Sequence, residues 1–298
     1  MKILFTGSNG LLGQKIAAAT TAYAEHQFLA TARGENRVLN LGTASYASMD
    51  ITDEQQTLQV IQEFRPDVII HGAAMTHVDQ CEEHKEQAYL LNVVGTQNIA
   101  SAATKVGAHV VHISTDFIFD GKDGPYKEEA EANPLSYYGE TKLEAEHIIA
   151  QLDHWSILRT VLVIGMAEDL SRSNIVLWAK GALEKGQSIN VVDDQFRTPT
   201  LAEDLAAGAL LAATQRAEGV FNISGPDFMS IYELVEAVAN HFGLSMDTVT
   251  KVSSTTLNQP AQRPPRTGFD ISKAREVLGY QPHSFVDALK VISTQAGL

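Results

Sequence analysis

The chain has 298 residues, of which 44% are hydrophobic and 19% charged, a composition that supplies a sizeable core and argues against disorder. Acidic residues outnumber basic ones by 36 to 22, and the net charge of −14 repels nucleic acid and anionic lipid. A single cysteine, Cys81, excludes an internal disulfide framework, and no apolar stretch reaches the length of a signal peptide core or a membrane span. We therefore predict a soluble, cytoplasmic protein with no nucleic-acid or membrane partner.

Short β-forming runs alternate with helical patterns through the first half of the chain. The runs predicted as strands, each apolar enough to be buried on both faces, are 2–6, 28–32, 67–72, 109–114 and 155–163. The segments predicted as helices are 11–24, 53–64, 86–107 and the stretch that contains Tyr138. This alternation predicts an α/β fold, with a Rossmann-type doubly wound parallel sheet joined by right-handed crossovers.

Glycines recur between the first predicted strand and the first helix, in FTGSNGLLG. Gly7 permits a tight turn, Gly10 lets the backbone approach a pyrophosphate, and Gly13 lets the helix pack closely on the sheet. A glycine-rich turn without a ligand is the alternative, but the strand–turn–helix context favours a dinucleotide site. The loop residues assigned to the cofactor are Gly7, Asn9, Gly10, Leu11, Leu12 and Gly13.

The end of the second strand bears on which cofactor binds. A NAD site usually carries an acid there, whereas LATARGENR has Arg33 and no acid at its tip. Arg33, with Arg37 nearby, suits a 2′-phosphate, which favours NADP(H) and leaves NAD(H) open; a solvated loop arginine is the alternative. Further along, Asp50 and Ile51 are assigned to the adenine end, although Asp50 could equally cap the next helix.

Two adjacent tyrosines precede a lysine in PLSYYGETKLEAEH. On a helix, residues four apart share a face, whereas residues five apart are about 140° away from one another. Tyr138 can therefore face Lys142, and Tyr137 cannot. Taken alone, the pattern is more often an ordinary helix start with one aromatic packed underneath.

The alternation of strands and helices changes after about Gly165. The remaining segments include a helix from Ala202, the strand-like VFNIS and the proline-rich NQPAQRPPRTG. We predict a dinucleotide-binding Rossmann domain over 1–165 and a mainly substrate-binding region over 166–298, some of whose segments return to the first domain.

These motifs together resemble the extended short-chain dehydrogenases/reductases, in order and spacing, over nearly the full length. The shared segments are the glycine loop, MDITD, HGAAMTHVDQCE, LLNVVGTQNIA, HISTDFIFDG and YYGETK. Within that group, STDFIFDG, ILRT and VVDDQFRTPTLAEDLA resemble the dTDP-4-dehydrorhamnose reductase branch. The resemblance implies NADPH-dependent reduction of a 4-keto-6-deoxy sugar nucleotide, such as dTDP-4-dehydro-L-rhamnose.

The resemblance also implies three catalytic residues. Tyr138 is the general acid, Lys142 its partner, and Thr115 the hydroxyl that orients the carbonyl oxygen. A phenol with a pKa of about 10 needs a nearby cation to favour its ionised form, so Lys142 is expected to lower the Tyr138 pKa and also to reach the nicotinamide ribose. Without the resemblance, Thr115 is simply a strand-end hydroxyl that caps a turn.

Further positions follow from the same resemblance. Gly72, Ala73 and Ala74 are small, as a backbone against a cofactor requires, or merely closely packed. Asn92 lies among apolar residues, needs a partner, and is expected to brace the backbone of the active site beside the cofactor.

The substrate in the resembling family is a nucleotide sugar with a diphosphate. Arg197 and Arg263 are candidates for the diphosphate, since a guanidinium fork suits phosphate oxygens, although each is alternatively a loop brace. Asp116 is assigned to the substrate pocket with Thr115. Phe196 either stacks on the base or packs in the core.

Some positions depart from the branch. Leu162 and Ile164 in RTVLVIG stand where the branch has RTSWVYG, and Arg197 replaces the glycine of DQFGAPT, which leaves the sugar open. The family can use Mg²⁺ at a subunit contact, and a homodimer is compatible. Asp193 and Asp194 lie nearby, but no ligand constellation supports a metal site, so we predict none.

Two alternatives remain at the level of sequence. One is a sugar-nucleotide epimerase or dehydratase with tightly bound NAD, disfavoured by the absence of an acid after the second strand. The other is a non-catalytic, NADP-binding regulatory subunit like that of methionine adenosyltransferase, disfavoured by the intact set of Thr115, Tyr138 and Lys142.

Overall fold

A seven-stranded sheet lies at the centre of the computed structural model, which describes residues 1–168, 174–257 and 259–297. The strand order is β11-β6-β5-β4-β1-β2-β3, and every neighbouring pair is parallel. The strands are β1 (Lys2–Thr6), β2 (Gln27–Ala32), β3 (Ser45–Ser48), β4 (Val68–His71), β5 (His109–Thr115), β6 (Trp155–Thr160) and β11 (Gly219–Asn222). The predicted Rossmann-type doubly wound sheet is confirmed. Its strand order reverses beside β1, where such sheets bind ligands at the carboxyl ends of the strands.

Helices cover both faces of the sheet, because successive side chains of a strand point to opposite faces. In β1, Ile3 and Phe5 enter the core on one face and Leu4 enters the core on the other. The helices of the first face are α1 (Leu11–Ala19) and α8 (Ala202–Gln215). Those of the second face are α2 (Glu54–Phe64), α5 (Gly95–Val106) and α6 (Tyr137–Ile149).

Three predicted elements are interrupted. The expected helix 86–107 consists of α4 (Lys85–Tyr89), a π-helical turn at 90–94, and α5. The expected helix 11–24 ends as α1 at Ala19 and continues as a 3₁₀ turn to Tyr23. The expected strand 155–163 breaks after β6, and the chain re-forms the short β7 (Val163–Ile164). In the break, Leu162 has a φ of 37°, which the ladder of an extended strand does not accommodate.

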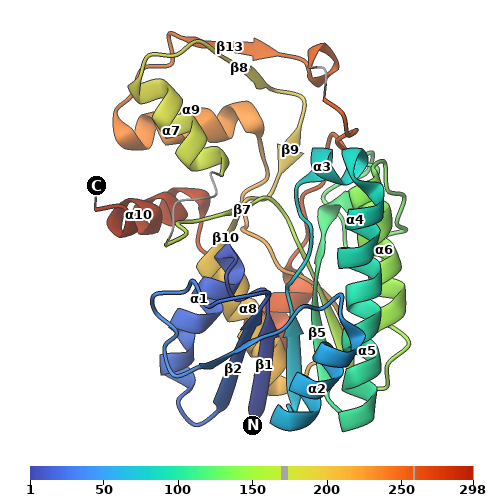
Figure 1. Ribbon diagram of the computed structural model, residues 1–298. Helices are drawn as coiled ribbons and strands as arrows, with labels where there is room; N and C mark the ends of the chain where they lie inside the picture. The colour runs from blue at the N-terminus through green and yellow to red at the C-terminus, as the bar shows by residue number, and fades with distance from the viewer. Residues whose placement is uncertain (169–173, 258, 298) are drawn as a thin grey trace.

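A smaller region with its own core lies beyond the carboxyl ends of the strands (Figure 1). Its elements are α7 (Ile175–Glu184), β8 (Ile189–Val192), α9 (Ile231–Phe242), β13 (Val249–Val252) and α10 (Phe285–Gln295). Short strand pairs lie between it and the sheet: β7 with β10 (Thr200–Leu201), and β9 (Phe196–Arg197) with β12 (Met229–Ser230). The helix α3 (Val78–Glu83) follows β4 in the chain. Among the described helices, none is long and apolar enough to span a membrane.

Candidate active site

The glycine loop has the geometry of a phosphate-binding turn. Gly7 directly follows β1 with a φ of +75°, a conformation that L side chains rarely adopt. Gly10 caps α1 without any side-chain hydrogen bond, so the first N–H groups of the helix are left for a ligand. A Cβ on Gly13 would run into the Gly7 carbonyl and the Ser8 backbone, so only glycine lets α1 lie this close to the loop.

A buried histidine, His71, ties the end of β1 to the end of β4. The Thr6 hydroxyl accepts hydrogen bonds from the N–H groups of Gly72 and Ala73, at 3.1 and 3.0 Å, and lies 2.9 Å from His71 Nδ1. With both lone pairs of Thr6 engaged, its hydrogen goes to Nδ1, which assigns the His71 proton to Nε2, opposite the Thr96 hydroxyl at 3.1 Å. Burial, and then the Lys142 charge, lower the His71 pKa to about 3, so this imidazole stays neutral.

The loop after β2 is held by the glycine loop itself. The Asn9 amide donates to the Glu35 carbonyl at 3.0 Å and accepts from the Arg37 N–H at 2.9 Å. The side chains of Arg33 and Arg37 remain exposed. Asn9 therefore fixes the loop that carries both guanidinium groups.

The alternative role of Asp50 as a helix cap is wrong. The cap of α2 is Asp53, whose side chain accepts from the Gln56 N–H. Asp50 instead accepts from the Thr52 N–H and hydroxyl, at 3.0 and 2.7 Å. Ile51 is buried and packs against Gly95 of α5. A Cβ on Gly95 would lie only 2.6 Å from the Ile51 side chain, so glycine at this position leaves room for Ile51.

Asn92 braces the chain that follows β4. Its Oδ1 accepts from the Met75 N–H at 2.7 Å, and its Nδ2 donates to the Met75 carbonyl and the Thr141 hydroxyl, at 3.1 and 3.0 Å. The Thr141 hydroxyl in turn donates to the Tyr138 carbonyl at 2.9 Å. Asn92 lies in the π-helical turn, a feature frequent at functional sites. Asn92 thus ties Met75 to α6, and its expected place beside the cofactor stays a prediction.

The two adjacent tyrosines take different positions at the start of α6. Tyr138 is 8% exposed, and its phenol lies close to the hydroxyl of Thr115, the last residue of β5. Tyr137 is half-buried, and its ring centre lies 4.8 Å from the Lys85 ammonium. The structure therefore brings Tyr138, and not Tyr137, to Thr115.

Close packing at Gly139 fixes the position of Tyr138. A Cβ on Gly139 would run into the Phe117 carbonyl, which shows how tightly α6 approaches the turn after β5. The Phe117 ring meets the Tyr138 ring edge-on, with 5.7 Å between centroids. Ser136 caps α6 and accepts from the Gly139 N–H at 3.3 Å.

Burial raises the pKa of Tyr138, and the Asp116 carboxylate and Cys81 act in the same direction, while the Thr115 hydrogen bond opposes them. The expected lowering of this pKa by Lys142 is therefore wrong for this arrangement, because desolvation dominates. A protonated phenol at neutral pH is the form that can give a proton to an alkoxide.

Lys142 lies one turn after Tyr138 and is 3% exposed. Its ammonium donates to the Ile113 carbonyl at 2.7 Å and lies 3.1 Å from His112 Nε2. Burial lowers the Lys142 pKa to about 8, and the Glu146 charge opposes this shift. The ammonium therefore predominates at neutral pH and is lost as the pH rises through about 8.

Asp116 joins this group to the C-terminal part of the chain. It accepts from the Thr115 hydroxyl at 3.1 Å and from the Thr267 hydroxyl, and it lies 3.7 Å from the Arg197 guanidinium. Burial raises the pKa of Asp116 even though Arg197 is beside it. Residues far apart in sequence thus meet at the carboxyl end of β5.

The two arginines expected to hold a diphosphate already have protein partners. Arg197 is buried and donates to the carbonyls of Phe196, Pro264 and Pro265. Arg263 pairs with Asp79 of α3 through two hydrogen bonds, of 3.0 and 2.8 Å. The loop-bracing alternative thus describes their contacts here, and their role toward a substrate stays a prediction.

A third arginine, Arg266, has no such partner within the described residues. Its guanidinium lies 4.6 Å from the Phe196 ring centre and 5.0 Å from that of Phe228. The two rings stack on each other, with 5.6 Å between centroids. Arg266 was not among the residues predicted to bind the diphosphate, although Arg263 lies in the same RPPR segment.

A model of one protein family, described as RmlD substrate binding domain, matches residues 1–297. The chain belongs to this family. A dTDP-4-dehydrorhamnose reductase of Aggregatibacter actinomycetemcomitans is 31% identical over 99% of each chain. Methionine adenosyltransferase 2 subunit beta of Xenopus tropicalis is also 31% identical, over 93% of this chain and 82% of that protein. A dTDP-4-dehydrorhamnose reductase of Bacillus anthracis, solved in complex with NADP, is 28% identical over 99% of each chain, with a TM-score of 0.83.

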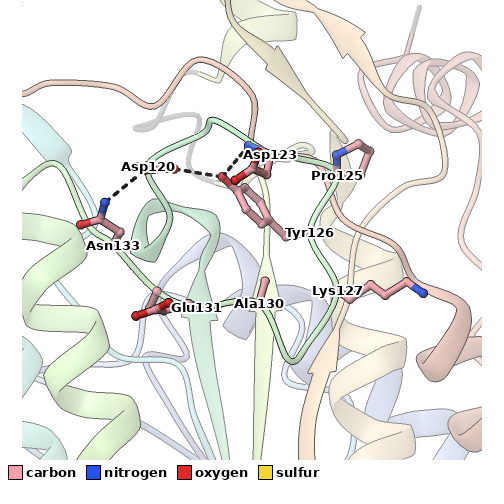
Figure 2. A pocket seen from close by; sticks show the side chains of 9 residues that line it. Asp120, Asp123, Pro125, Tyr126, Lys127, Ala130, Glu131 and Asn133 are labelled. Carbon is pink, nitrogen blue, oxygen red and sulfur yellow. Dashed lines mark hydrogen bonds between the residues drawn. The ribbon is translucent and has the colours of Figure 1, made fainter.

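This member of the RmlD family has a surface pocket in the loop that follows β5. The pocket of about 600 Å³ is lined by the loop after β5, residues 120–133, and not by Thr115, Tyr138 or Lys142 (Figure 2). Figure 2 shows Asp120 hydrogen-bonded to Asn133 and to the Tyr126 hydroxyl, at 3.0 and 3.2 Å. These bonds brace the loop.

Acidic residues on the substrate side do not gather around a common point. Asp194 accepts from the Ser253 hydroxyl and from the N–H and hydroxyl of Ser254. Over the described ranges, no group of three or more His, Cys, Asp or Glu side chains is placed to hold a metal ion. A role for Mg²⁺ therefore gains no support from these contacts.

Proposed function

We propose that this protein is an NADPH-dependent oxidoreductase that reduces the 4-keto group of a 6-deoxy sugar nucleotide. The observation that carries the proposal is the buried phenol of Tyr138, close to the Thr115 hydroxyl and one helical turn from Lys142. Family membership supports it, since relatives over the full length are named dTDP-4-dehydrorhamnose reductase. The substrate to test first is dTDP-4-dehydro-L-rhamnose, with dTDP-L-rhamnose as the product.

The residues present suit a dinucleotide. Gly7 and Gly10 leave a cradle at the N-terminus of α1, and the small Gly72, Ala73 and Ala74 follow β4 beside Gly7. When bound, NADPH supplies the hydride that the ketone carbon receives. Leu11, Leu12, Asp50 and Ile51 are proposed to line the same site, and the NADP complex of the Bacillus anthracis relative supports the choice of cofactor.

The protein's own groups then handle the carbonyl oxygen. The Thr115 and Tyr138 hydroxyls orient this oxygen, and Tyr138 gives its proton to the alkoxide as charge develops there. Lys142, one helical turn after Tyr138, is proposed to hydrogen-bond the nicotinamide ribose when the cofactor is bound. The high Tyr138 pKa keeps the proton in place until that step.

On the substrate side, we propose that Arg266 meets the diphosphate. It is partly exposed and stacked on Phe196 and Phe228, so its N–H groups remain for phosphate oxygens. Phe196 then contacts the nucleotide sugar at the same place. Arg197 and Asp116 shape the pocket wall through their mutual contact. A homodimer and the domain boundary near residue 165 stay predictions.

The first experiment measures NADPH oxidation by the purified protein with dTDP-4-dehydro-L-rhamnose, and with GDP-linked 4-keto sugars in parallel. We expect turnover with at least one of them and conversion of the ketone to an alcohol. A protein that binds NADPH but reduces none of these sugars would contradict the proposal. NAD(H) released on denaturation would then favour an epimerase or dehydratase. Stoichiometric recovery of a methionine adenosyltransferase would favour the regulatory role suggested by the Xenopus relative.

Replacing Arg33 with alanine is expected to raise the KM for NADPH about 10- to 100-fold, since a charge-assisted contact to a 2′-phosphate contributes about 1.5–3 kcal/mol. The KM for NADH should stay unchanged, because that cofactor lacks the phosphate. Steady-state kinetics with both cofactors provide the measurement. Arg275→Ala, which removes another exposed arginine, is the matched control. An equal loss for NADH and NADPH would assign Arg33 to the solvated loop instead.

A further inference from the structure

A second buried histidine, His112, lies beneath Lys142. It belongs to β5, is 1% exposed, and its ring centroid lies 5.3 Å from that of His71 on the neighbouring strand β4. Its Nε2 is 3.1 Å from the Lys142 Nζ, and the adjacent Ile113 carbonyl is 2.7 Å from the same atom. Strand β5 therefore presents two consecutive acceptors to one ammonium group.

The positions of the protons follow from these contacts. An ammonium has three donors and no acceptor, so His112 Nε2 must accept, and the His112 proton must sit on Nδ1. That Nδ1 is buried and meets no partner in the described part of the chain. Burial lowers the His112 pKa well below its usual range, and the charge of Lys142 adds to the shift. His112 is thus a neutral imidazole with one nitrogen committed to Lys142 and the other unpaired.

An unpaired buried N–H is unfavourable, and an apolar side chain on β5 would avoid it. His109 on the same strand is also buried, but its ring has a structural partner, the Ser156 hydroxyl at 3.1 Å. The Nδ1 of His112 has no such partner among the described residues. The contact that distinguishes His112 is the one to Lys142. This contact fixes the direction of one N–H group of the ammonium, and the Ile113 carbonyl fixes a second.

We propose that His112 is a positioning residue for Lys142. Its neutral Nε2 and the Ile113 carbonyl each accept one ammonium hydrogen, which leaves the third N–H for the reacting side of the site. The contact also stabilises the charged form of Lys142, since a hydrogen bond to a charged form favours that form. The link to turnover rests on the proposed reductase function, whereas the link to the Lys142 charge does not.

The other charged and titratable groups around Lys142 come from three elements. Glu146 on α6 favours the ammonium, but its carboxylate is paired with Arg159 of β6. His71 on β4 is neutral, as shown by its hydrogen bonds to Thr6 and Thr96. Replacing His112 therefore removes an uncharged hydrogen-bond acceptor and leaves every nearby charged group in place. A change in the Lys142 pKa in such a variant would report on the hydrogen bond itself.

The test follows the ionisation of Lys142 directly, by NMR titration of the protein labelled with ¹³C at lysine Cε. The Lys142 signal is assigned by its loss in Lys142→Met. We expect a midpoint at about 8 in the wild type. In His112→Leu the midpoint should fall by roughly one pH unit, the size expected for one hydrogen bond to a charged group. His112→Gln, which restores a carbonyl acceptor, should return it toward the wild-type value.

His109→Leu is the matched control, because it removes a buried histidine of the same strand that contacts Ser156 rather than Lys142. If His112→Leu does not fold, His112→Met removes the acceptor with a more adaptable side chain. A midpoint in His112→Leu or His112→Met equal to that in His109→Leu would overturn the proposal. So would a midpoint in His112→Gln as low as in the apolar variants.

Kinetics provide the second readout. In His112→Leu, kcat is expected to fall about tenfold with little change in the KM for the sugar, and the alkaline limb of kcat/KM should move to lower pH with the Lys142 midpoint. His112→Gln should recover most of kcat. A wild-type protein without turnover would reject the proposed function, while the NMR titration would still decide the role of His112.

Discussion

Replacing Tyr138 with phenylalanine is expected to reduce kcat about 10²- to 10⁴-fold, the range that a positioned general acid contributes. Tyr137→Phe should keep kcat within a few-fold of the wild type. The contrast is large because only the Tyr138 hydroxyl lies close to Thr115. The Tyr137 ring instead lies against the ammonium of Lys85, the first residue of α4. The measurement is the initial rate of NADPH oxidation with the sugar that the wild type reduces.

The same pair of variants is internally controlled, since both remove one hydroxyl from adjacent residues. Tyr138→Phe keeps the ring that packs edge-on against Phe117, so NADPH binding and thermal stability should change little. NADPH affinity, measured by fluorescence titration, separates a chemical defect from a binding defect. Equal rates for the two variants would remove Tyr138 from the mechanism and make its Thr115 contact structural.

Replacing Arg159 with methionine is expected to lower the free energy of unfolding by about 3–5 kcal/mol, because it leaves the Glu146 carboxylate buried without its counter-ion. The two side chains are 8% and 5% exposed. Arg159 Nε and Nη2 donate to the two Glu146 oxygens at 3.0 and 2.8 Å, and Nη1 donates to the Glu128 carbonyl at 2.9 Å. Equilibrium unfolding in urea provides the measurement.

The double variant Arg159→Met/Glu146→Leu separates loss of the pair from loss of one partner. We expect it to recover most of the stability, since an apolar pair of similar volume avoids the cost of a buried lone charge. Lys180→Met, which leaves the exposed Glu184 unpaired, is the matched control and should change stability by less than about 1 kcal/mol. If Arg159→Met also lowered the free energy of unfolding by less than about 1 kcal/mol, water would have to reach the Glu146 carboxylate.

The pair also connects stability to the candidate site. Glu146 lies one helical turn after Lys142 on α6, and Arg159 lies on β6, the neighbour of β5. The ion pair thus holds the helix that carries Tyr138 and Lys142 against the strands that carry Thr115 and His112. Restored stability in the double variant without restored turnover would indicate that this alignment needs the ion pair.

The pattern of apolar and polar residues along short stretches of sequence was sufficient to predict the architecture. Apolar runs and helical periodicity depend on neighbours in sequence, and they predicted the parallel sheet and the helices on both faces. The spacing of Gly7, Gly10 and Gly13 predicted the turn at the end of β1, because each glycine has a local steric reason. The four-residue spacing of Tyr138 and Lys142 likewise placed both on the buried side of α6.

Local pattern was insufficient where the decisive partner lies far along the chain. Arg263 pairs with Asp79, and Arg197 with the carbonyls of residues 264 and 265, contacts that no spacing rule indicates. The helix 86–107 was predicted as continuous, whereas the π-helical turn lets Asn92 reach Met75.

The fold class, the glycine turn and the position of Tyr138 on the face of Lys142 could therefore be predicted from the chain alone, since each depends on residues within one element or one turn. Tertiary structure decided the electrostatics of the site. The pKa of Tyr138 is raised rather than lowered because burial outweighs charge, and the Lys142 ammonium faces His112, thirty residues away, because α6 packs on β5. Desolvation and long-range hydrogen bonds exist only once the chain has closed around these groups.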